Sequence, residues 1–551
     1  MEGKVVVFCK NTETSAEYPE GVSVNEIQHM LNIKTDTPVL GVLVNNRLRN
    51  LNYRIYSPKT IEFVQMRSEM GFRIYFRTLW MVFAKALHDI SPEASMRIEY
   101  PISYGFYCTI QGIQCTESLI HSVRERMQDI VRSNMKIEMC EERTDVVAER
   151  FREFGAFDTA KLLSTVNRQY SRYYRIDNYI DYYTYILAPS TGYVTTFDLV
   201  PYEDGVLLVL PDVNDMNRPG HVFKSPKVFK SHRDFNVWNR LMGMNNVGDF
   251  NEICRNGGIR QLLKMSESLH EKRIAEIADS ILERKSKFIL IAGPSSSGKT
   301  TFSKRLEVQL RIIGINPIVL SVDDFFVDRE FTPRDENGDY DFEHLNALDL
   351  DLLDRTLNGL LRGEEVEIPQ YDFAEGKKHF NGNRIRMSEY SVVVMEGIHA
   401  LNPDMVPNIP QDAVFRIFVE PSTSIPFDNH NWAAPSDIRL VRRILRDYKF
   451  RAYSAQNTIR RWPSVRRGEM RWIYPFQENA DVIFNSALIF ELAVLRNYVE
   501  PLLRQVPEAS DEYATARRLL DYFDYYELVS DREIPPTSLL REFVGGSSFH
   551  Y

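Results

Sequence analysis

The sequence predicts a multidomain α/β protein with a parallel sheet in its C-terminal half. Near-continuous apolar runs start at Phe288, Pro317 and Ser391 and alternate with helical patterns. Such runs are typical of parallel strands covered on both faces. The chain has 551 residues, too many for one hydrophobic core, and one domain per ~150 residues predicts three or four domains.

Composition limits the classes of function. A formal net charge of -9 argues against nucleic-acid binding through a global positive field. The five cysteines are scattered and form no CxxC pair, which favours a reduced chain over a disulfide or zinc scaffold. No run of ~18 apolar residues could span a bilayer, and the start MEGKVVVFCK lacks the features of a signal peptide. We therefore expect a cytoplasmic protein without membrane association.

Residues 1–67 read as short strands around one helix. The expected strands cover Val5 to Phe8, Val39 to Val44 and Thr60 to Val64, and the expected helix covers Val24 to Leu31. The turn Asn45-Asn46-Arg47 lies between two apolar runs and suits a hairpin. The pattern predicts a small mixed sheet holding one helix, and it resembles the TGS domain, the β-grasp module of threonyl-tRNA synthetases.

Residues 68–215 resemble the α+β editing-type domain of the same synthetases. The resemblance rests on FRTLWMVFAKAL, on the YPISYGFYCTI that follows it, and on YIDYYTYILAPSTG. Where those enzymes carry two histidines, and then a cysteine and a histidine, this chain has Arg77, Met81, Tyr183 and Leu187. Met and Leu cannot replace the lost ligands at a catalytic Zn²⁺. We expect a retained scaffold without deacylase activity.

Two helical regions flank the last domain. Residues 216–285 have helical apolar spacing, interrupted at Gly257-Gly258, and predict a helical connector. Residues 491–551 predict a C-terminal helical extension that becomes extended after Pro535-Pro536. The aromatic run YFDYYEL near its centre is expected to pack in a core.

The strand that starts at Phe288 runs into FILIAGPSSSGKTT, which fits the P-loop pattern GxxxxGK[ST]. Backbone N–H groups of such a loop, with the N-terminus of the next helix, form an anion site. Lys299 adds a positive charge for the outer phosphates, and the Thr300 hydroxyl is placed to ligate Mg²⁺. ATP and Mg²⁺ are thus the predicted cofactors. The predicted ATP-binding residues are Gly293, Pro294, Ser295, Ser296, Ser297, Gly298, Lys299, Thr300 and Thr301.

Carboxylates follow two further strands of this predicted sheet. Asp323-Asp324 follow one strand and Glu396 follows the other. Ligands of parallel sheets gather beyond the carboxyl ends of the strands, so these groups should meet the P-loop at one edge. Phosphoryl transfer needs an acceptor hydroxyl oriented and a metal held. We expect Asp323 to be the catalytic base and Glu396 to serve the metal, although a solvated strand-end carboxylate is the alternative for each acid alone.

An arginine-rich helix is predicted in DIRLVRRILRD. Arg439, Arg442, Arg443 and Arg446 recur at helical spacing, with Arg451 just beyond. A solvated basic face is the usual outcome of such a run. Opposite an ATP site these guanidinium groups could instead clamp the γ-phosphate. Together with Lys299, Arg446 and Arg451 are the predicted catalytic cations.

Residues 286–490 resemble uridine kinase, of the uridine kinase and phosphoribulokinase group. The resemblance rests on IVLSVDDFF, DYDFEHLNALD, EIPQYDF, VVVMEGIHAL and the arginine-rich helix, in that order. It implies that Asp323 is the general base, that Tyr371 and Phe373 contact the base of a nucleoside, and that Arg443, in the arginine-rich lid helix, binds the substrate.

Three departures from the family pattern bear on the acceptor. Asn346 stands where we align the family's ribose-binding Asp, Gly376 stands where a base-reading His is expected, with His379 three residues later, and Tyr453 replaces the final lid Arg. Asn346 can still hydrogen-bond to substrate but carries no charge.

The whole pattern predicts an ATP-dependent kinase of a uridine- or cytidine-like nucleoside, acting on the ribose 5′-hydroxyl. Two alternatives stay open: a kinase of another small alcohol, as in phosphoribulokinase, and a tRNA-binding regulator that senses ATP. The synthetase-like domains imply tRNA or another ligand as a partner, and a homo-oligomer is compatible with the sequence.

Overall fold

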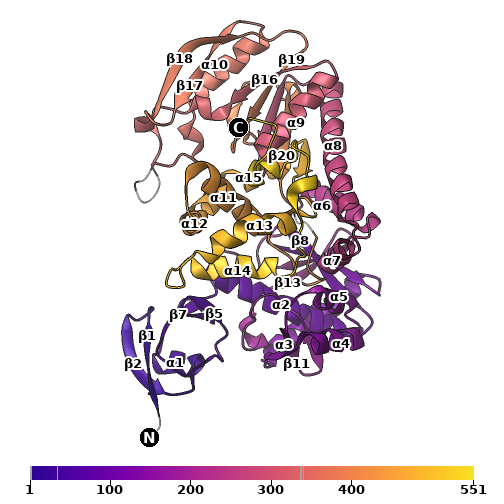
Figure 1. Cartoon of the computed structure of the whole chain (residues 1–551), viewed down its shortest axis with the longest axis vertical. Coiled ribbons are helices and arrows are strands. Elements are labelled where there is room, and N and C mark those ends of the chain that lie inside the picture. The colour runs from indigo at the N-terminus through magenta and orange to yellow at the C-terminus, as the bar shows by residue number, and fades with distance from the viewer. Residues whose placement is uncertain (1–2, 34, 335–337, 339, 423–424, 551) are drawn as a thin grey trace.

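The computed structural model describes residues 3–33, 35–334, 338, 340–422 and 425–550. The chain runs from a small N-terminal sheet, through a mixed unit and a helical connector, into a parallel sheet, and its C-terminal segment lies in the middle of the molecule (Figure 1). Within the described part, no helix is long and apolar enough to cross a membrane.

The N-terminal sheet has five strands in the order β2-β1-β7-β4-β5. Strands β1 and β7 pair in parallel, and the remaining neighbours are antiparallel. The turn Asn45-Asn46 has positive φ at both residues (47° and 58°) and joins β4 to β5, as a two-residue hairpin requires. The strands are β1 (Lys4–Cys9), β2 (Thr14–Pro19), β4 (Val39–Val44), β5 (Arg47–Arg49) and β7 (Lys59–Gln65).

One helix, α1 (Val24–Met30), packs on this sheet through Val24 and Ile27, which are buried. Ser23 caps it and forms a capping box with Glu26, which satisfies N–H groups at the helix start. Short strands β3 (Val22–Ser23) and β6 (Arg54–Ile55) pair beside it. The predicted mixed sheet around one helix is therefore confirmed.

The second unit is built around the long helix α2 (Glu69–Ile90), most of which is buried. An antiparallel sheet in the order β13-β14-β9-β8 and a second sheet in the order β10-β11-β12 accompany it. The strands are β8 (Ser95–Ile102), β9 (Gly105–Gln111), β10 (Glu138–Arg143), β11 (Tyr170–Ile176), β12 (Tyr179–Asp181), β13 (Asp198–Tyr202) and β14 (Gly205–Val209). The further helices are α3 (Glu117–Arg132), α4 (Thr144–Phe154) and α5 (Phe157–Thr165).

Three helices connect this unit to the parallel sheet. They are α6 (Pro226–Leu241), α7 (Val247–Arg255) and α8 (Ile259–Arg284). Gly257 has a φ of +78° between α7 and α8, a conformation that favours glycine. The predicted break at Gly257-Gly258 therefore separates two helices, and α8 runs along one side of the last sheet (Figure 1).

The C-terminal sheet is parallel throughout, in the order β16-β19-β15-β20-β21. Its central strand leads into the P-loop and helix α9 (Lys299–Ile312). The strands are β15 (Phe288–Ala292), β16 (Asn316–Ser321), β19 (Ser391–Glu396), β20 (Val414–Glu420) and β21 (Val482–Asn485). The predicted parallel α/β sheet is confirmed.

The remaining elements surround the carboxyl edge of this sheet. A hairpin of β17 (Val366–Asp372) and β18 (Lys377–Ile385) stands to one side with α10 (Leu350–Leu361), as Figure 1 shows. The arginine-rich helix is α11 (Pro435–Arg451), and α12 (Ala455–Trp472) follows it. Helices α13 (Glu491–Arg504) and α14 (Tyr513–Phe523) lead to the C-terminal segment.

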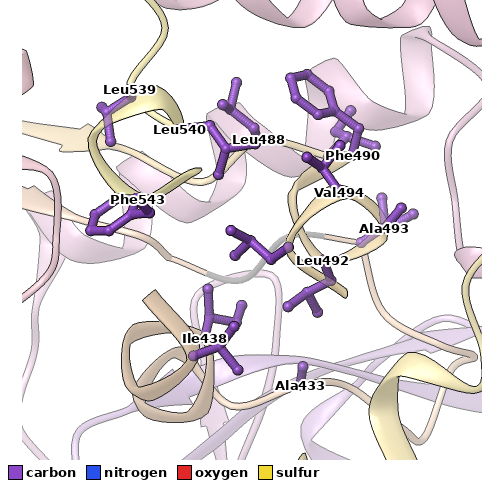
Figure 2. Packing of buried hydrophobic residues seen from close by; sticks show 14 of the residues in the cluster. Ala433, Ile438, Leu488, Phe490, Leu492, Ala493, Val494, Leu539, Leu540 and Phe543 are labelled. Atoms are coloured by element: carbon purple, nitrogen blue, oxygen red, sulfur yellow. The ribbon is translucent and has the colours of Figure 1, made fainter. Parts of the chain in front are cut away.

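The C-terminal segment differs from the expectation in one respect. After Pro535-Pro536 it forms the short helix α15 (Arg541–Val544) instead of an extended stretch. Leu539, Leu540 and Phe543 are fully buried (0% exposed). They belong to one apolar cluster with Ile438 of α11, with Leu488 just before α13 and with Leu492 in α13 (Figure 2). Burying each such side chain contributes about 1.5–3 kcal/mol, so this segment belongs to the core. The aromatic residues around Tyr525 are also buried, as predicted.

Candidate active site

At two positions of the P-loop, only glycine fits the backbone geometry. Gly298 has a φ of +88° just before α9, and a Cβ on Gly293 would overlap the carbonyl oxygen of Val419 in β20. These positions let the loop turn tightly between β15 and the helix. The N-terminal N–H groups of α9 are thereby directed at the loop's concave side, where they favour an anion.

Lys299 is folded back onto this loop. Its Nζ donates to the carbonyl oxygens of Gly293 (2.9 Å) and Pro294 (3.3 Å). Burial lowers the pKa of Lys299, and the nearby Glu396 carboxylate opposes that shift. The ammonium group is thus desolvated, without an ion pair among the described residues, which prepares it to meet an anion.

Thr300 and Glu396 lie together beside the loop. The Thr300 hydroxyl donates to Glu396 Oε1 at 3.0 Å, and Oε2 lies 3.3 Å away. Burial raises the pKa of Glu396, and Lys299 opposes the shift. Strand register explains the meeting, because Glu396 pairs with Ile291 of β15 at the carboxyl edge. When phosphates supply some of its ligands, Mg²⁺ takes only one or two oxygen ligands from the protein. The Thr300 hydroxyl and the Glu396 carboxylate fit this requirement.

Asp323 and Asp324 have different surroundings. The Asp324 carboxylate accepts the backbone N–H of Tyr371 (3.2 Å). The Asp323 side chain is reached by solvent, yet the surrounding protein raises its pKa by desolvation, against the opposing charge of Lys299. The Asp323 carboxylate therefore lies within the electrostatic reach of Lys299, and its role as the general base stays a prediction.

Aromatic rings lie next to these acids. Tyr371 and Phe373, both singled out from the sequence, have ring centroids 5.1 Å apart and are nearly perpendicular. Phe326, which follows the Asp323 turn, lies 5.6 Å from Tyr371 and 6.2 Å from Phe373. Phe373 remains 59% exposed, so a flat ligand could stack on its ring. Tyr371 is only 5% exposed and supports Phe373 from below, which differs from the expectation that both rings contact a base.

Sequence reasoning missed Glu343 as a candidate for the acceptor site. Burial raises the pKa of Glu343 to about 7, with a further contribution from Glu469 and an opposing one from Arg443. A Cβ on Gly468 of α12 would overlap this carboxylate, so the glycine permits the close approach. The residue lies inside the DYDFEHLNALD element, whose first residue, Asp339, is outside the described residues. Its neighbours come from distant segments, which the sequence pattern does not indicate.

Asn346, the residue predicted for the acceptor, lies on the exposed side of a short 3₁₀ turn, Leu345–Ala347. Its backbone N–H donates to His344 Nδ1 (3.0 Å), and the residue is exposed to solvent. His379 pairs with Glu375 (3.0 Å) and is also exposed. The structure does not bring either side chain into contact with Asp323.

The arginines of α11 divide into two groups. Arg439 and Arg442 are fully buried and are ion-paired with Glu469 (2.8 Å) and Glu491 (2.7 Å). Both also donate to backbone carbonyls of the P-loop, Arg439 to Ser295 and Arg442 to Ser297 (3.2 Å each). Arg439 and Arg442 therefore support the loop through its backbone, whereas we expected all four guanidinium groups to face the phosphates.

The second group reaches the loop by side chain. Arg443 donates to Ser295 Oγ at 2.8 Å and Arg446 at 3.3 Å. Arg451 lies 3.4 Å from Asp447 and is half exposed. These three remain the predicted cations for phosphate. Farther along the chain, in α12, Arg460 pairs with Glu512 and Arg461 lies over the ring of Tyr453.

The four positions aligned with synthetase metal ligands are filled by packing. Arg77 is buried among the rings of Phe76, Trp80 and Tyr185, 4.9 to 5.5 Å from their centroids. Burial lowers its pKa to about 10. Met81, Tyr183 and Leu187 belong to one buried apolar cluster. The Tyr183 hydroxyl donates to Asp181 (2.7 Å), which also pairs with His430 (2.9 Å).

Known proteins resemble the part of the chain that carries this site. Residues 288–490 match the Phosphoribulokinase / Uridine kinase family. A uridine kinase of Ligilactobacillus salivarius is 31% identical over 202 residues, which is 36% of this chain and 85% of that protein. The chain belongs to this family. A uridine kinase of Vibrio vulnificus is 29% identical over 219 residues, 39% of this chain and 94% of that protein.

A solved structure is also similar to part of the chain. The structure of a possible uridine kinase from Bacillus stearothermophilus is 21% identical, with a TM-score of 0.27, and covers 39% of this chain and 97% of its own. Membership of the phosphoribulokinase and uridine kinase family makes the chain a phosphotransferase with an alcohol acceptor. The acceptor is therefore a nucleoside or another small alcohol.

Proposed function

We propose that the chain transfers the γ-phosphoryl group of ATP to the ribose 5′-hydroxyl of a uridine- or cytidine-like nucleoside. The observation that supports a nucleoside most directly is the aromatic patch beside the candidate base. Asp324 ties the backbone of Tyr371 to the Asp323 turn, so a base stacked on Phe373, the exposed ring beside Tyr371, would lie close to Asp323. The matched relatives named uridine kinase favour the same acceptor.

In this proposal each residue has one role. Asp323 accepts the proton of the acceptor hydroxyl as the bond to phosphorus forms. Lys299, Arg446 and Arg451 neutralise the charge of the phosphoryl group in transfer. Residues Gly293 to Thr301 supply the phosphate cradle. Thr300 and Glu396 would hold Mg²⁺, which neutralises charge on the β- and γ-phosphates when bound.

Other residues would hold the acceptor nucleoside. We assign Tyr371 and Phe373 to the base, and Asn346, Arg443 and Glu343 to the ribose side. Aromatic rings stack on any base, and the residue at the family's base-reading position is Gly376, whose side of the turn is occupied by Arg329. Base selectivity should therefore be loose.

We expect ATP consumption with uridine and cytidine, and less than a hundredfold preference in kcat/KM for either over purine nucleosides. The measurement is coupled ATP turnover against nucleosides, sugar phosphates and pantothenate, with and without uncharged tRNA, and with EDTA in a parallel series. EDTA should abolish turnover, and Mg²⁺ should restore it.

Turnover with a sugar phosphate alone would replace the nucleoside by a phosphoribulokinase-like acceptor. RNA binding without turnover on any alcohol would favour the ATP-sensing regulator. A strict uridine preference would show that groups other than the rings read the base edge. The matched variant Phe373→Leu, at an exposed ring, should raise KM for the nucleoside and leave KM for ATP unchanged.

For the N-terminal part we propose a β-grasp TGS-like domain at 1–67 and an editing-like domain at 68–215 that acts through binding. The connector (216–285), kinase domain (286–490) and C-terminal extension (491–551) complete this division. Supporting it are the sheet order around α1 and the residues Arg77, Met81, Tyr183 and Leu187 at the metal positions. Without His and Cys ligands, no Zn²⁺-bound water is available to hydrolyse an aminoacyl ester.

A contact joins this domain to α11. Arg73 of α2 donates to both carboxylate oxygens of Asp437 at the start of α11 (3.0 and 3.1 Å). Arg518 and Tyr522 of α14 bond the same carboxylate, and these partners lower the pKa of Asp437 against the effect of burial. A ligand that shifts α2 would therefore shift the helix that carries Arg443 and Arg446, and coupling would be reciprocal.

We expect the purified chain to contain no stoichiometric zinc and to leave the mischarged tRNA substrates of threonyl-tRNA synthetase intact. Elemental analysis and a deacylation assay measure this. Arg73→Gln should change the KM for ATP by several-fold without abolishing turnover, because Arg518 still pairs with Asp437. Zinc at one equivalent with measurable deacylation would refute the binding-only role, and unchanged kinetics of Arg73→Gln would remove the coupling.

A further inference from the structure

The C-terminal segment from Ser538 to Gly545 packs against the P-loop, although about 240 positions separate the two in sequence. Figure 2 shows Leu539, Leu540 and Phe543 of this segment turned toward the apolar cluster that includes Ile438 of α11 and Leu488. The segment therefore reaches the loop from the side of the lid helix. None of the roles assigned above uses it.

The first contact is a hydrogen bond to the start of the P-loop helix. The buried Thr301 hydroxyl donates to Glu542 Oε2 at 2.7 Å. Thr301 lies in the first turn of α9, next to Thr300, whose backbone and hydroxyl belong to the phosphate cradle. Glu542 is itself only 7% exposed. A carboxylate at a helix N-terminus is stabilising, so the bond holds this turn in place.

The second contact is apolar and touches the loop backbone. A Cβ placed on Gly298 would overlap the side chain of Leu539. Leu539 therefore lies directly against the residue whose φ of +88° turns the loop into α9. Filling this space opposes any flattening of the turn.

The third contact includes α11, the arginine-rich helix. The ring of Phe543 lies 5.1 Å from the guanidinium carbon of Arg442, and Arg442 donates to the Ser297 carbonyl of the P-loop (3.2 Å). Ser538 also donates to Glu267 of α8. One segment thus joins the loop, the lid helix and the connector.

The segment could support the P-loop permanently, or it could compete with ATP and leave when ATP binds. Release would expose Leu539, Leu540 and Phe543, which are all fully buried, and the cost of exposing them would offset most of the free energy that nucleotide binding supplies. A segment so firmly packed acts as a permanent part of the site.

We propose that the segment Ser538 to Gly545 is a positioning element of the ATP site. Glu542 acts through Thr301, and Leu539 acts through Gly298, to hold the P-loop in its phosphate-binding shape. This inference rests on the proposed ATP-dependent function.

The test uses full-length variants and two readouts. ATP binding is measured by calorimetry without acceptor, and KM values for ATP and acceptor are measured in turnover. Glu542→Leu and Leu539→Ala should each raise the Kd for ATP about tenfold, in line with the loss of one hydrogen bond or of packing. KM for the acceptor should change less than about twofold. Glu542→Gln, whose amide oxygen still accepts from Thr301, should recover most of the affinity.

A double-mutant cycle separates Glu542 from other effects. If Glu542 acts through Thr301, the pair Thr301→Val and Glu542→Leu should raise the Kd no further than either change alone. Leu540→Ala is the matched control, because it removes an equally buried leucine from the next position. It should lower the melting temperature as much as Leu539→Ala and leave the Kd for ATP unchanged.

Three results would overturn the inference. Unchanged affinity in Glu542→Leu and Leu539→Ala would mean that the segment only stabilises the fold. Tighter ATP binding in either variant would make it a competitor. Additive losses in the cycle would disconnect Glu542 from Thr301. Failure of the wild-type chain to bind ATP would instead refute the proposed function, and this inference with it.

Discussion

Replacing Asp323 with Asn is expected to lower kcat by ~10²–10⁴ and to leave ATP binding nearly unchanged. The carboxylate lies at the carboxyl edge of the sheet beside Lys299, and the protein around it raises its pKa. An amide of the same shape cannot take up the proton of the substrate hydroxyl. Steady-state kinetics, with ATP affinity measured by calorimetry, provide the comparison.

The pH dependence gives a second readout of the same group. Catalysis requires the ionised carboxylate, so activity should fall as the pH drops through the pKa of Asp323. Because that pKa is raised, the fall should begin at a higher pH than for an ordinary aspartate. The acidic limb should be lost in Asp323→Asn.

Asp324→Asn is the matched control, because Asp324 accepts the Tyr371 N–H and supports the aromatic patch. It should raise KM for the acceptor more than it lowers kcat. Near-normal turnover in Asp323→Asn, with a large loss of kcat in Asp324→Asn, would transfer the base role to Asp324.

Replacing Lys299 with Ala should damage both ATP binding and transfer, with a loss in kcat/KM of ~10²–10³. Its ammonium group is desolvated and bonded only to loop carbonyls among the described residues. Phosphates would give it a partner of opposite charge. Kinetics over a range of ATP concentrations separate the effect on KM from the effect on kcat.

Lys304→Ala is the control for a general loss of positive charge on α9. Lys304 lies on the same helix, partly exposed and 4.0 Å from Glu307, and its loss should change kcat/KM less than about twofold. Equal losses in the two variants would mean that Lys299 acts through the overall field. Circular dichroism should show that both variants are folded.

The sequence by itself determined the local chemistry of this protein. Glycines at Gly293 and Gly298, between an apolar strand and a helical pattern, indicate one backbone geometry. Residues that follow strand ends, such as Asp323 and Glu396, are placed at one edge by the rules of parallel sheets. The N-terminal mixed sheet was likewise readable, because strand alternation and the Asn45-Asn46 turn are local signals.

Only the tertiary structure decided which of several similar residues does what. Arg439 and Arg443 share one helix and one residue type, but Arg439 meets buried Glu469 whereas Arg443 reaches Ser295. Burial raises the pKa of Glu343, whose carboxylate lies against Gly468 of α12, and Thr301 meets Glu542 across the fold. These differences depend on burial and on partners far away in sequence. Periodicity and motif spacing carry no information about such partners, because each reflects only neighbours along the chain.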